Sequence, residues 1–191
     1  MKILIFGASG SGKTTLGKEI EKRSDFIHLD SDDYYWRKTK VPFTEKVPLA
    51  VRNEKIKLDF KKNKNVIVSG SMLTWGEEWK AAFDLAIFIR LDNNERMKRL
   101  KKREIQRYGD KLRNDQVTRK NSKEYLDWAN QYENPKFDGR TLRVHNDWIK
   151  LLNCEVLRID GGAQLNNKVE KVLIALKTTA NNVCNKLPKF G

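Results

Sequence analysis

A glycine-rich octapeptide near the start of the chain constrains its fold more than any other stretch. Residues 7–14 read Gly-Ala-Ser-Gly-Ser-Gly-Lys-Thr and follow the apolar run at residues 3–6. They fit the pattern G-x-x-x-x-G-K-[ST], the phosphate-binding loop called Walker A. The apolar run is typical of a buried strand, and residues 14–23 are predicted to form a helix. The sequence therefore predicts a nucleoside triphosphate site between a strand and a helix N-terminus.

The residue types of this loop suit ATP and Mg²⁺. Lys13 can reach the β- and γ-phosphates, which makes it a candidate catalytic residue, and the Thr14 hydroxyl can ligate Mg²⁺. Glycines let successive backbone N–H groups point at phosphate oxygens. We expect ATP contacts from the loop and the next residue: Gly7, Ala8, Ser9, Gly10, Ser11, Gly12, Lys13, Thr14 and Thr15. The alternative is a glycine-rich turn that binds nothing.

Strands and helices alternate along the rest of the chain. Apolar runs predict strands at residues 2–6, 26–29, 66–68, 85–91 and 156–159, and helices are expected at 14–23, 49–62, 94–108, 114–132, 140–152 and from 165 onwards. In the helix at 49–62, we expect Leu49, Ile56 and Phe60 to face inward. This alternation predicts an α/β fold with a five-stranded parallel sheet and right-handed crossovers. The 191 residues suit a single domain, and the polar segment 107–139 is too long for a simple crossover, so we expect a mobile lid insertion there.

Polar residues follow several of these strands, at the edge where parallel sheets bind ligands. Residues 30–33 read Asp-Ser-Asp-Asp and come directly after the second strand. A carboxylate at that place can orient an attacking hydroxyl and accept its proton. We expect Asp30 and Asp32 to diverge, one towards the metal and one towards an acceptor. A turn that only caps and solvates a loop is the alternative.

In element order and in three motifs the chain resembles the P-loop small-molecule kinases, which include adenylate, shikimate, gluconate and uridine kinases. The first motif is the Walker loop. The second is residues 30–32, similar to the D-x-D of shikimate kinases, overlapping residues 32–35, similar to the D-[SD]-[FY]-[FY] of uridine and nicotinamide riboside kinases. The third motif is residues 88–92 and the arginine-rich helix after them, which are similar to the fourth strand and the lid entry of these kinases.

This resemblance implies a P-loop NTPase-type three-layer sandwich with a helical lid, and it implies roles for individual residues. Asp32 would bind the acceptor and take part in catalysis, and Asp30 would contact Mg²⁺ through water beside Thr14. The acceptor site would comprise Asp32, Asp33, Tyr35, Ser69 and Gly70. The third strand ends in Ser-Gly-Ser without an acidic Walker B residue, as in shikimate kinases, which argues against a mechanical ATPase.

Four arginines of the basic helix share one stripe because they lie three or four residues apart: Arg96, Arg99, Arg103 and Arg107. In the kinases that the chain resembles, lid arginines close over the transferring phosphoryl group, and a guanidinium suits that task because it forks onto phosphate oxygens. Arg103 and Arg107 are our candidates for this catalytic role. The alternative is a solvated basic face, which the neighbouring lysines favour.

Two further groups of polar and aromatic residues could lie near the expected ligand site. Arg140, Arg143, His145 and Trp148 are predicted to lie on a helix surface, with contact to nucleotide or acceptor as the alternative. Aromatic residues flank the expected acceptor side, where they could stack on a base or sugar or simply pack in the core: Tyr34, Tyr35, Trp36, Trp75 and Trp79.

The net charge of +14, with a pI near 9.8, suggests a nucleic acid, a phosphate-rich small molecule or only a biased composition. The basic residues are spread along the chain, and no aromatic residue lies between residues 93 and 107. We therefore expect nucleic-acid binding to be weak and non-specific at most. No run approaches the roughly 20 apolar residues of a membrane span. We expect a cytoplasmic protein without membrane contact, as a monomer or homodimer.

The sequence thus predicts an ATP- and Mg²⁺-dependent kinase whose small-molecule acceptor is a nucleoside or nucleotide. Three alternatives stay open. The acceptor could be a sugar acid or shikimate-type metabolite. It could instead be the 5′-hydroxyl of a nucleic acid, because the phage polynucleotide kinase also combines a Walker loop with a similar acidic turn. Finally, the chain could be a nucleotide-dependent regulatory module that catalyses nothing.

Overall fold

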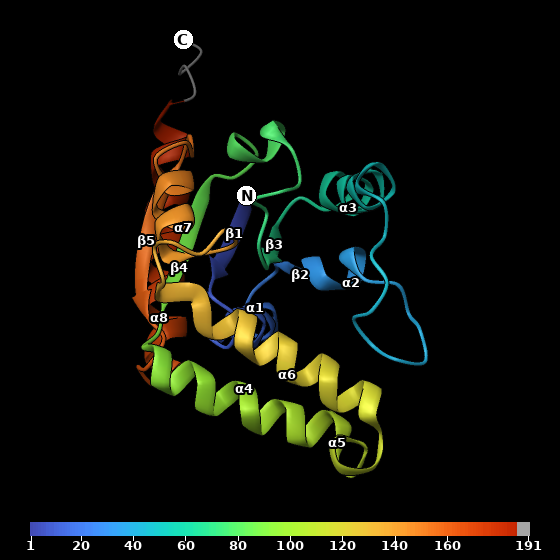
Figure 1. The fold of residues 1–191 in the computed structure, drawn as a ribbon. Coiled ribbons are helices and arrows are strands. Elements are labelled where there is room, and N and C mark those ends of the chain that lie inside the picture. The colour runs from blue at the N-terminus through green and yellow to red at the C-terminus, as the bar shows by residue number, and fades with distance from the viewer. Residues whose placement is uncertain (187–191) are drawn as a thin grey trace.

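The computed structural model describes residues 1–186, with side-chain burial described through residue 179. Its centre is a five-stranded, entirely parallel sheet in the order β2-β3-β1-β4-β5 (Figure 1). The strands are β1 (Lys2–Gly7), β2 (Ile27–Asp30), β3 (Val66–Ser69), β4 (Leu85–Arg90) and β5 (Glu155–Asp160). The five predicted strands and their parallel arrangement are confirmed.

Alternation along the central strand divides the core into two layers. Ile3 and Ile5 of β1 face α1 (Lys13–Lys22) and α8 (Leu165–Lys186), whereas Leu4 and Phe6 face the opposite side. The opposite layer contains α3 (Leu49–Lys62), the short 3-10 helix η1 (Glu77–Lys80) and α7 (Leu142–Ile149). With β1, β3 and most of β4 buried on both faces, this is the three-layer α/β architecture that the sequence predicted.

Two details of α3 and α7 correct the expectations. Leu49 is 46% exposed because it begins α3 at the surface, while Ile56 is fully buried as predicted. The helix expected over residues 140–152 spans only Leu142–Ile149, since the Thr141 hydroxyl accepts from the Val144 N–H and caps its start. His145 and Trp148 are buried, so the prediction that they lie on the surface is wrong.

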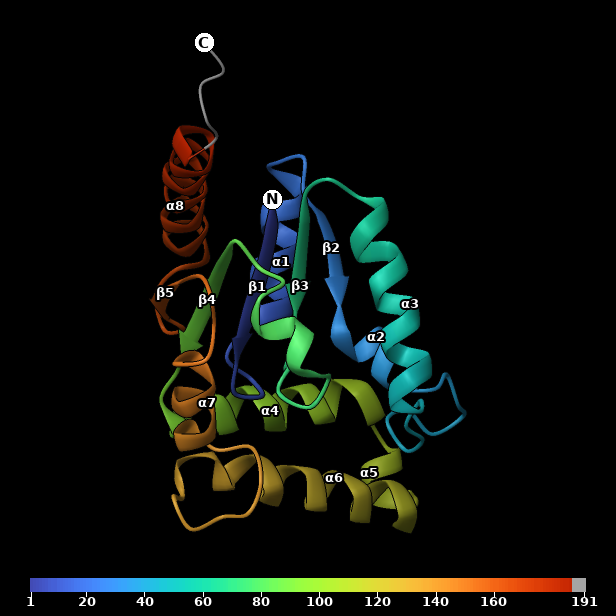
Figure 2. The same cartoon turned by 90° about the horizontal axis from the view of Figure 1, so that it is seen from above.

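A helical hairpin lies across the carboxyl edge of the sheet, as Figure 2 shows. It consists of α4 (Asn93–Tyr108), α5 (Lys111–Asn114), α6 (Gln116–Asn130) and the 3-10 turn η2 (Gln131–Glu133). Gly109 has φ 51°, a left-handed conformation that turns the chain after α4. The helix predicted over 114–132 is interrupted at its start because Asp115 caps α6. The insertion is therefore helical, and its mobility stays a prediction.

One further short helix lies at the carboxyl edge of the sheet. The short helix α2 (Ser31–Tyr35) follows β2 directly, and Asp30 caps it by accepting from the Asp32 N–H. Within residues 1–186, none of the helices combines the length and the apolar character that crossing a bilayer requires.

Candidate active site

The phosphate-binding loop connects β1 to α1, as predicted. Gly7 leaves β1 where an added Cβ would lie 2.3 Å from the Ile89 carbonyl oxygen, so no side chain fits there. Gly12 has φ 98°, a conformation that favours glycine, and it forms the N-cap of α1. The loop therefore presents backbone N–H groups and a helix N-terminus at one point, the arrangement that binds phosphate.

Lys13 lies over this loop, with its Nζ donating to the Ala8 carbonyl oxygen at 2.8 Å. Burial, and next the positive charge of Arg140, lower the pKa of Lys13 to about 8. The nearby carboxylates of Asp32 and Asp30 oppose that shift. A phosphate group would provide the counter-charge that this crowded ammonium needs.

Thr14 and Asp30 meet at the start of α1. The Thr14 hydroxyl donates to Asp30 Oδ2 at 2.8 Å, and the other Asp30 oxygen caps α2. A hydroxyl and one carboxylate are a donor set suited to Mg²⁺, which is usually held by one or two carboxylates together with substrate phosphates and water. Within residues 1–186, no cluster of three His, Cys, Asp or Glu side chains forms an all-protein cage. The residues present thus fit a Mg²⁺ ion that arrives with a nucleotide.

Asp32 lies on α2, whose N-terminus is held beside the phosphate loop by the Thr14–Asp30 hydrogen bond. The residue is exposed to solvent, but many protein atoms lie around its carboxylate. This partial burial, followed by the negative charge of Asp30, raises the pKa of Asp32. The positive charges of Lys13, Arg140 and Arg103 act on it in the opposite direction. A carboxylate with a raised pKa beside a phosphate site is a candidate general base.

Arg140 was predicted to lie on a helix surface, but it lies before α7 and is half-buried. It precedes the N-cap of α7, its guanidinium lies 4.9 Å from the Trp128 ring centroid, and its charge acts on both Lys13 and Asp32. Burial lowers the pKa of Arg140, as expected for a cation held inside the crevice and not on a helix surface. The local sequence signal for this placement is that Arg140 precedes Thr141, a residue type that caps helices.

The arginines of α4 divide among different surroundings. Arg99 Nη2 donates to the Gly161 carbonyl at 3.3 Å, beside the phosphate loop. Arg103 bonds the Tyr125 hydroxyl of α6, and its charge acts on Lys13 and Asp32. Arg107 lies 4.3 Å from the Phe43 ring centroid and 3.4 Å from Glu104. Of the two predicted catalytic arginines, Arg103 is therefore the one that the structure places near the reacting groups.

The predicted acceptor residues lie in unequal surroundings. Ser69 is fully buried, and its hydroxyl lies 2.8 Å from His28 Nε2, so it is not available to a ligand. Gly70 lies directly against Ser31. Asp33 is exposed on α2. The Tyr35 ring lies 4.2 Å from the Arg52 guanidinium.

Arg52 was not among the predicted site residues. It projects from α3, is 7% exposed and lies between the Tyr35 and Trp75 rings. Its Nη2 donates to the Thr74 carbonyl at 3.3 Å, and its Nε has no partner. Two aromatic faces and one carbonyl thus hold this cation on the expected acceptor side, and none of the salt bridges within residues 1–179 involves it.

The comparison with protein families decides the classification. Residues 3–127, more than half of the chain, match a family model described as an AAA domain. The chain belongs to this family. Its AAA domain contains the phosphate loop, the acidic turn and most of the α4–α6 hairpin. A Bacillus subtilis (strain 168) relative, the "Uncharacterized protein YqaC", is 37% identical over 171 residues, which cover 90% of this chain and 94% of the relative.

Solved structures with similar folds are kinases of small molecules. The shikimate kinase of Bacteroides thetaiotaomicron superposes with a TM-score of 0.59 at 16% identity, covering 93% of this chain and 98% of that one. The deoxyadenosine kinase of M. mycoides gives 0.54 at 18% identity, covering 93% and 100%. The shikimate kinase of Aquifex aeolicus gives 0.53 at 19%, covering 94% and 98%. At these identities the likeness concerns the fold: this AAA domain has the fold of P-loop small-molecule kinases.

Proposed function

We propose that this AAA domain is an ATP- and Mg²⁺-dependent kinase that transfers the γ-phosphoryl group to a small-molecule acceptor. The observation that carries the proposal is the Thr14–Asp30 hydrogen bond, which places the start of α2 and Asp32 beside the phosphate loop, where the charges of Lys13, Arg103 and Arg140 act on the Asp32 carboxylate. A merely structural turn has no need of a carboxylate with a raised pKa beside a phosphate loop.

The proposed reaction assigns one task to each group. Asp32 accepts the proton of the acceptor hydroxyl while the oxygen of that hydroxyl forms a bond to the γ-phosphorus. The bond between the γ-phosphorus and the β–γ bridging oxygen breaks, which releases ADP. Lys13, Arg103 and Arg140 stabilise the negative charge on the transferring group. Thr14 and Asp30 would hold Mg²⁺, which supplies charge neutralisation on the phosphates when bound.

Among acceptors, a nucleoside or nucleotide remains our first candidate, and the surroundings of Arg52 favour an anionic one. A nucleotide phosphate or the carboxylate of a sugar acid would complement the charge of Arg52, which forms no salt bridge within residues 1–179, whereas an uncharged nucleoside would not. The aromatic rings of Tyr35 and Trp36, 4.8 Å apart, offer apolar surface for a base or sugar.

A phosphoryl-transfer screen with Mg·ATP tests this proposal. The panel contains nucleosides, nucleoside monophosphates, sugar acids including shikimate, and 5′-hydroxyl oligonucleotides, and the readout is ADP together with the phosphorylated product. We expect turnover with a monophosphate or a sugar acid. Tight ATP binding without transfer to any acceptor would contradict a kinase and favour a nucleotide-dependent regulatory module.

A further inference from the structure

Arg96 of α4 is a fully buried cation without an anionic partner. Its side chain is 0% exposed, and within residues 1–186 no carboxylate forms a salt bridge with it. Glu133, a nearby carboxylate, instead binds Arg90 with both oxygens, at 2.7 and 2.9 Å. A buried charge with only neutral partners costs stability, so a specific role has to account for its presence.

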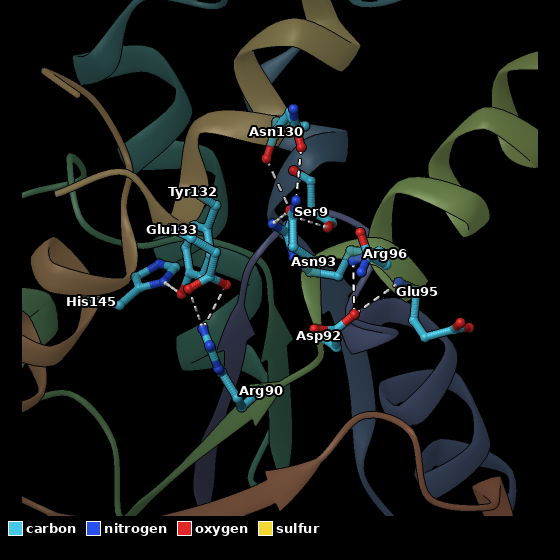
Figure 3. Close-up of polar contacts among 12 residues, drawn as sticks. Ser9, Arg90, Asp92, Asn93, Glu95, Arg96, Asn130, Tyr132, Glu133 and His145 are labelled. Carbon is cyan, nitrogen blue, oxygen red and sulfur yellow. Dashed lines mark hydrogen bonds and ion pairs between the residues drawn. The ribbon is translucent and has the colours of Figure 1, made fainter. Parts of the chain in front are cut away.

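Three segments of the chain meet at the Arg96 guanidinium (Figure 3). Its Nη1 donates to the Ser9 carbonyl of the phosphate loop at 3.2 Å and to the Ala129 carbonyl at the end of α6 at 3.4 Å. Its Nη2 donates to Asn93 Oδ1 at 2.5 Å, and Asn93 in turn donates to Asn130 Oδ1 at 2.8 Å. The planar fork of an arginine can bind such divergent acceptors simultaneously, which a lysine ammonium on a flexible stem does less well.

The aromatic side of this cluster extends into the core. The Arg96 guanidinium lies 4.9 Å from the ring centroid of Tyr132, whose hydroxyl is 2.6 Å from His145 Nδ1. His145 packs edge-on against Phe6 at the end of β1, 5.6 Å between ring centroids. Burial, the main cause, lowers the pKa of His145 to about 3, so the ring is neutral near pH 7 and adds no second charge. Arg96 is thus held from one side by the core and from the other by the hairpin.

The contact with Ser9 has a consequence for the phosphate loop. Because a peptide unit is planar and trans, the Ser9 carbonyl and the Gly10 N–H point in opposite directions. Arg96 holds the carbonyl towards α4, so the Gly10 N–H points away from α4. Gly10 has φ 83°, and an added Cβ there would lie 3.0 Å from both the Arg96 carbonyl oxygen and the Leu100 side chain. The loop therefore lies directly against α4, and its orientation depends on that helix.

We propose that Arg96 is a positioning residue that fixes the Ser9–Gly10 peptide for phosphate binding and couples nucleotide binding at the loop to the position of the α4–α6 hairpin. The inference rests on the nucleotide-binding half of the proposed function and needs no particular acceptor. A nucleotide that orders the loop would, through Arg96, also order the end of α6.

Arg90 provides a matched control. It too is an arginine that ties the hairpin to the sheet, through Glu133 of η2, but none of its hydrogen bonds reaches the phosphate loop. The test compares Arg96→Met and Arg96→Lys with Arg90→Met. The readouts are the affinity for a fluorescent, non-hydrolysable ATP analogue with Mg²⁺ and the hydrogen exchange of peptides covering residues 7–14 and 116–133, with and without the analogue.

We expect Arg96→Met to bind the analogue about tenfold more weakly, the effect of losing about one hydrogen bond, with Arg96→Lys in between. In the wild type the analogue protects both peptides, whereas in Arg96→Met it no longer protects residues 116–133. Arg90→Met should keep an affinity within about twofold of the wild type, a change below the worth of one hydrogen bond. Unfolding midpoints without nucleotide identify loss of fold, and if Arg96→Met does not fold, Arg96→Lys decides.

Two results would overturn the inference. One is wild-type affinity and coupled protection in a folded Arg96 variant. The other is an equal loss of affinity in Arg90→Met, which would mean that any anchor of the hairpin suffices. Failure of the kinase proposal looks different, because the wild type would then bind the analogue and yet transfer phosphate to no acceptor.

Discussion

Asp30 and Asp32 carry the same charge two residues apart, yet they have different partners. Asp30 accepts from the Thr14 hydroxyl and from the Asp32 N–H, which engages both of its oxygens. Asp32 has a raised pKa from burial and from Asp30 itself, and it faces Lys13 and the arginines. The two carboxylates therefore have different surroundings, while their expected divergence, one towards a metal and one towards an acceptor, stays a prediction.

Asparagine substitutions separate those roles. We expect Asp32→Asn to lower kcat by about 10²–10⁴, the usual contribution of a general base, with little change in ATP affinity. Asp30→Asn should instead raise the Mg²⁺ concentration required for half-maximal activity, because it removes a metal-side charge. Steady-state kinetics over a Mg²⁺ titration distinguish the two. Reversed effects would exchange the roles, and two silent variants would remove the acidic turn from the mechanism.

The pKa shifts of Asp32 and Lys13 predict how the proposed kinase activity depends on pH. Asp32 must be ionised, so kcat/KM should rise with pH through a value above the ordinary aspartate pKa. Lys13 must be charged, and its pKa of about 8 predicts that kcat/KM for Mg·ATP falls above about pH 8. Bound phosphates favour the charged lysine, so the alkaline limb of kcat should lie at higher pH. A kcat/KM that stays flat from about pH 7 to 10 would contradict this role of Lys13.

At the scale of elements, the α4–α6 hairpin is held to the sheet at its base and lacks comparable anchors at its far end. Arg90 and Arg96 hold the η2 side, whereas α5 follows Gly109 and contributes no buried residue. Arg107 reaches across to the Phe43 ring in the loop before α3. Such a hairpin can pivot about its base over the crevice.

We predict that residues 107–139 gain protection from hydrogen exchange when a nucleotide binds, with the largest change around α5 (Lys111–Asn114). The end of α6 should also gain protection, through Arg96, but by a smaller amount because Arg96 already bonds the Ala129 carbonyl. Mass-spectrometric exchange with a non-hydrolysable analogue measures this directly. Unchanged protection across the whole segment would mean that the hairpin is a fixed part of the fold.

Element bounds could be read from the sequence where a local pattern sets them. The apolar runs of β3 and β4 and the helix over 49–62 are examples. The burial of Arg52 and Arg96 could not, because a charged residue in an amphipathic segment is buried only when distant segments surround it. His145 and Trp148 were misplaced for the same reason: α7 is covered by β1 and β4, which are remote in sequence.

For the molecule as a whole, the net charge of +14 is a surplus of basic residues that are spread along the sequence. Several basic side chains already have local tasks, such as Arg23 with Glu19, Arg90 with Glu133 and Lys123 with Asp127. Exposed pairs of this kind contribute little to stability but neutralise charge locally. We continue to expect that the surplus positive charge serves a dispersed surface and the phosphate site.

We predict that oligonucleotide binding is weak and is lost between about 50 and 200 mM salt, as counterion release requires. A salt titration of binding, run beside a 5′-hydroxyl phosphorylation assay, checks this. Tight binding that survives at the higher salt, or efficient labelling of oligonucleotide ends, would instead favour the polynucleotide kinase alternative.

The proposed kinase activity requires the phosphate loop to bind the transferring phosphates, and substitution of Lys13 is the sharpest test of that requirement. The measurement is the rate of phosphoryl transfer from Mg·ATP to the acceptor panel by wild type and by Lys13→Ala, with circular dichroism to confirm the fold. We predict a folded variant whose rate is lower by about 10²–10³, the typical effect of losing one positioned charge contact at the transferring group. Full turnover by Lys13→Ala would show that the phosphate loop does not serve phosphoryl transfer.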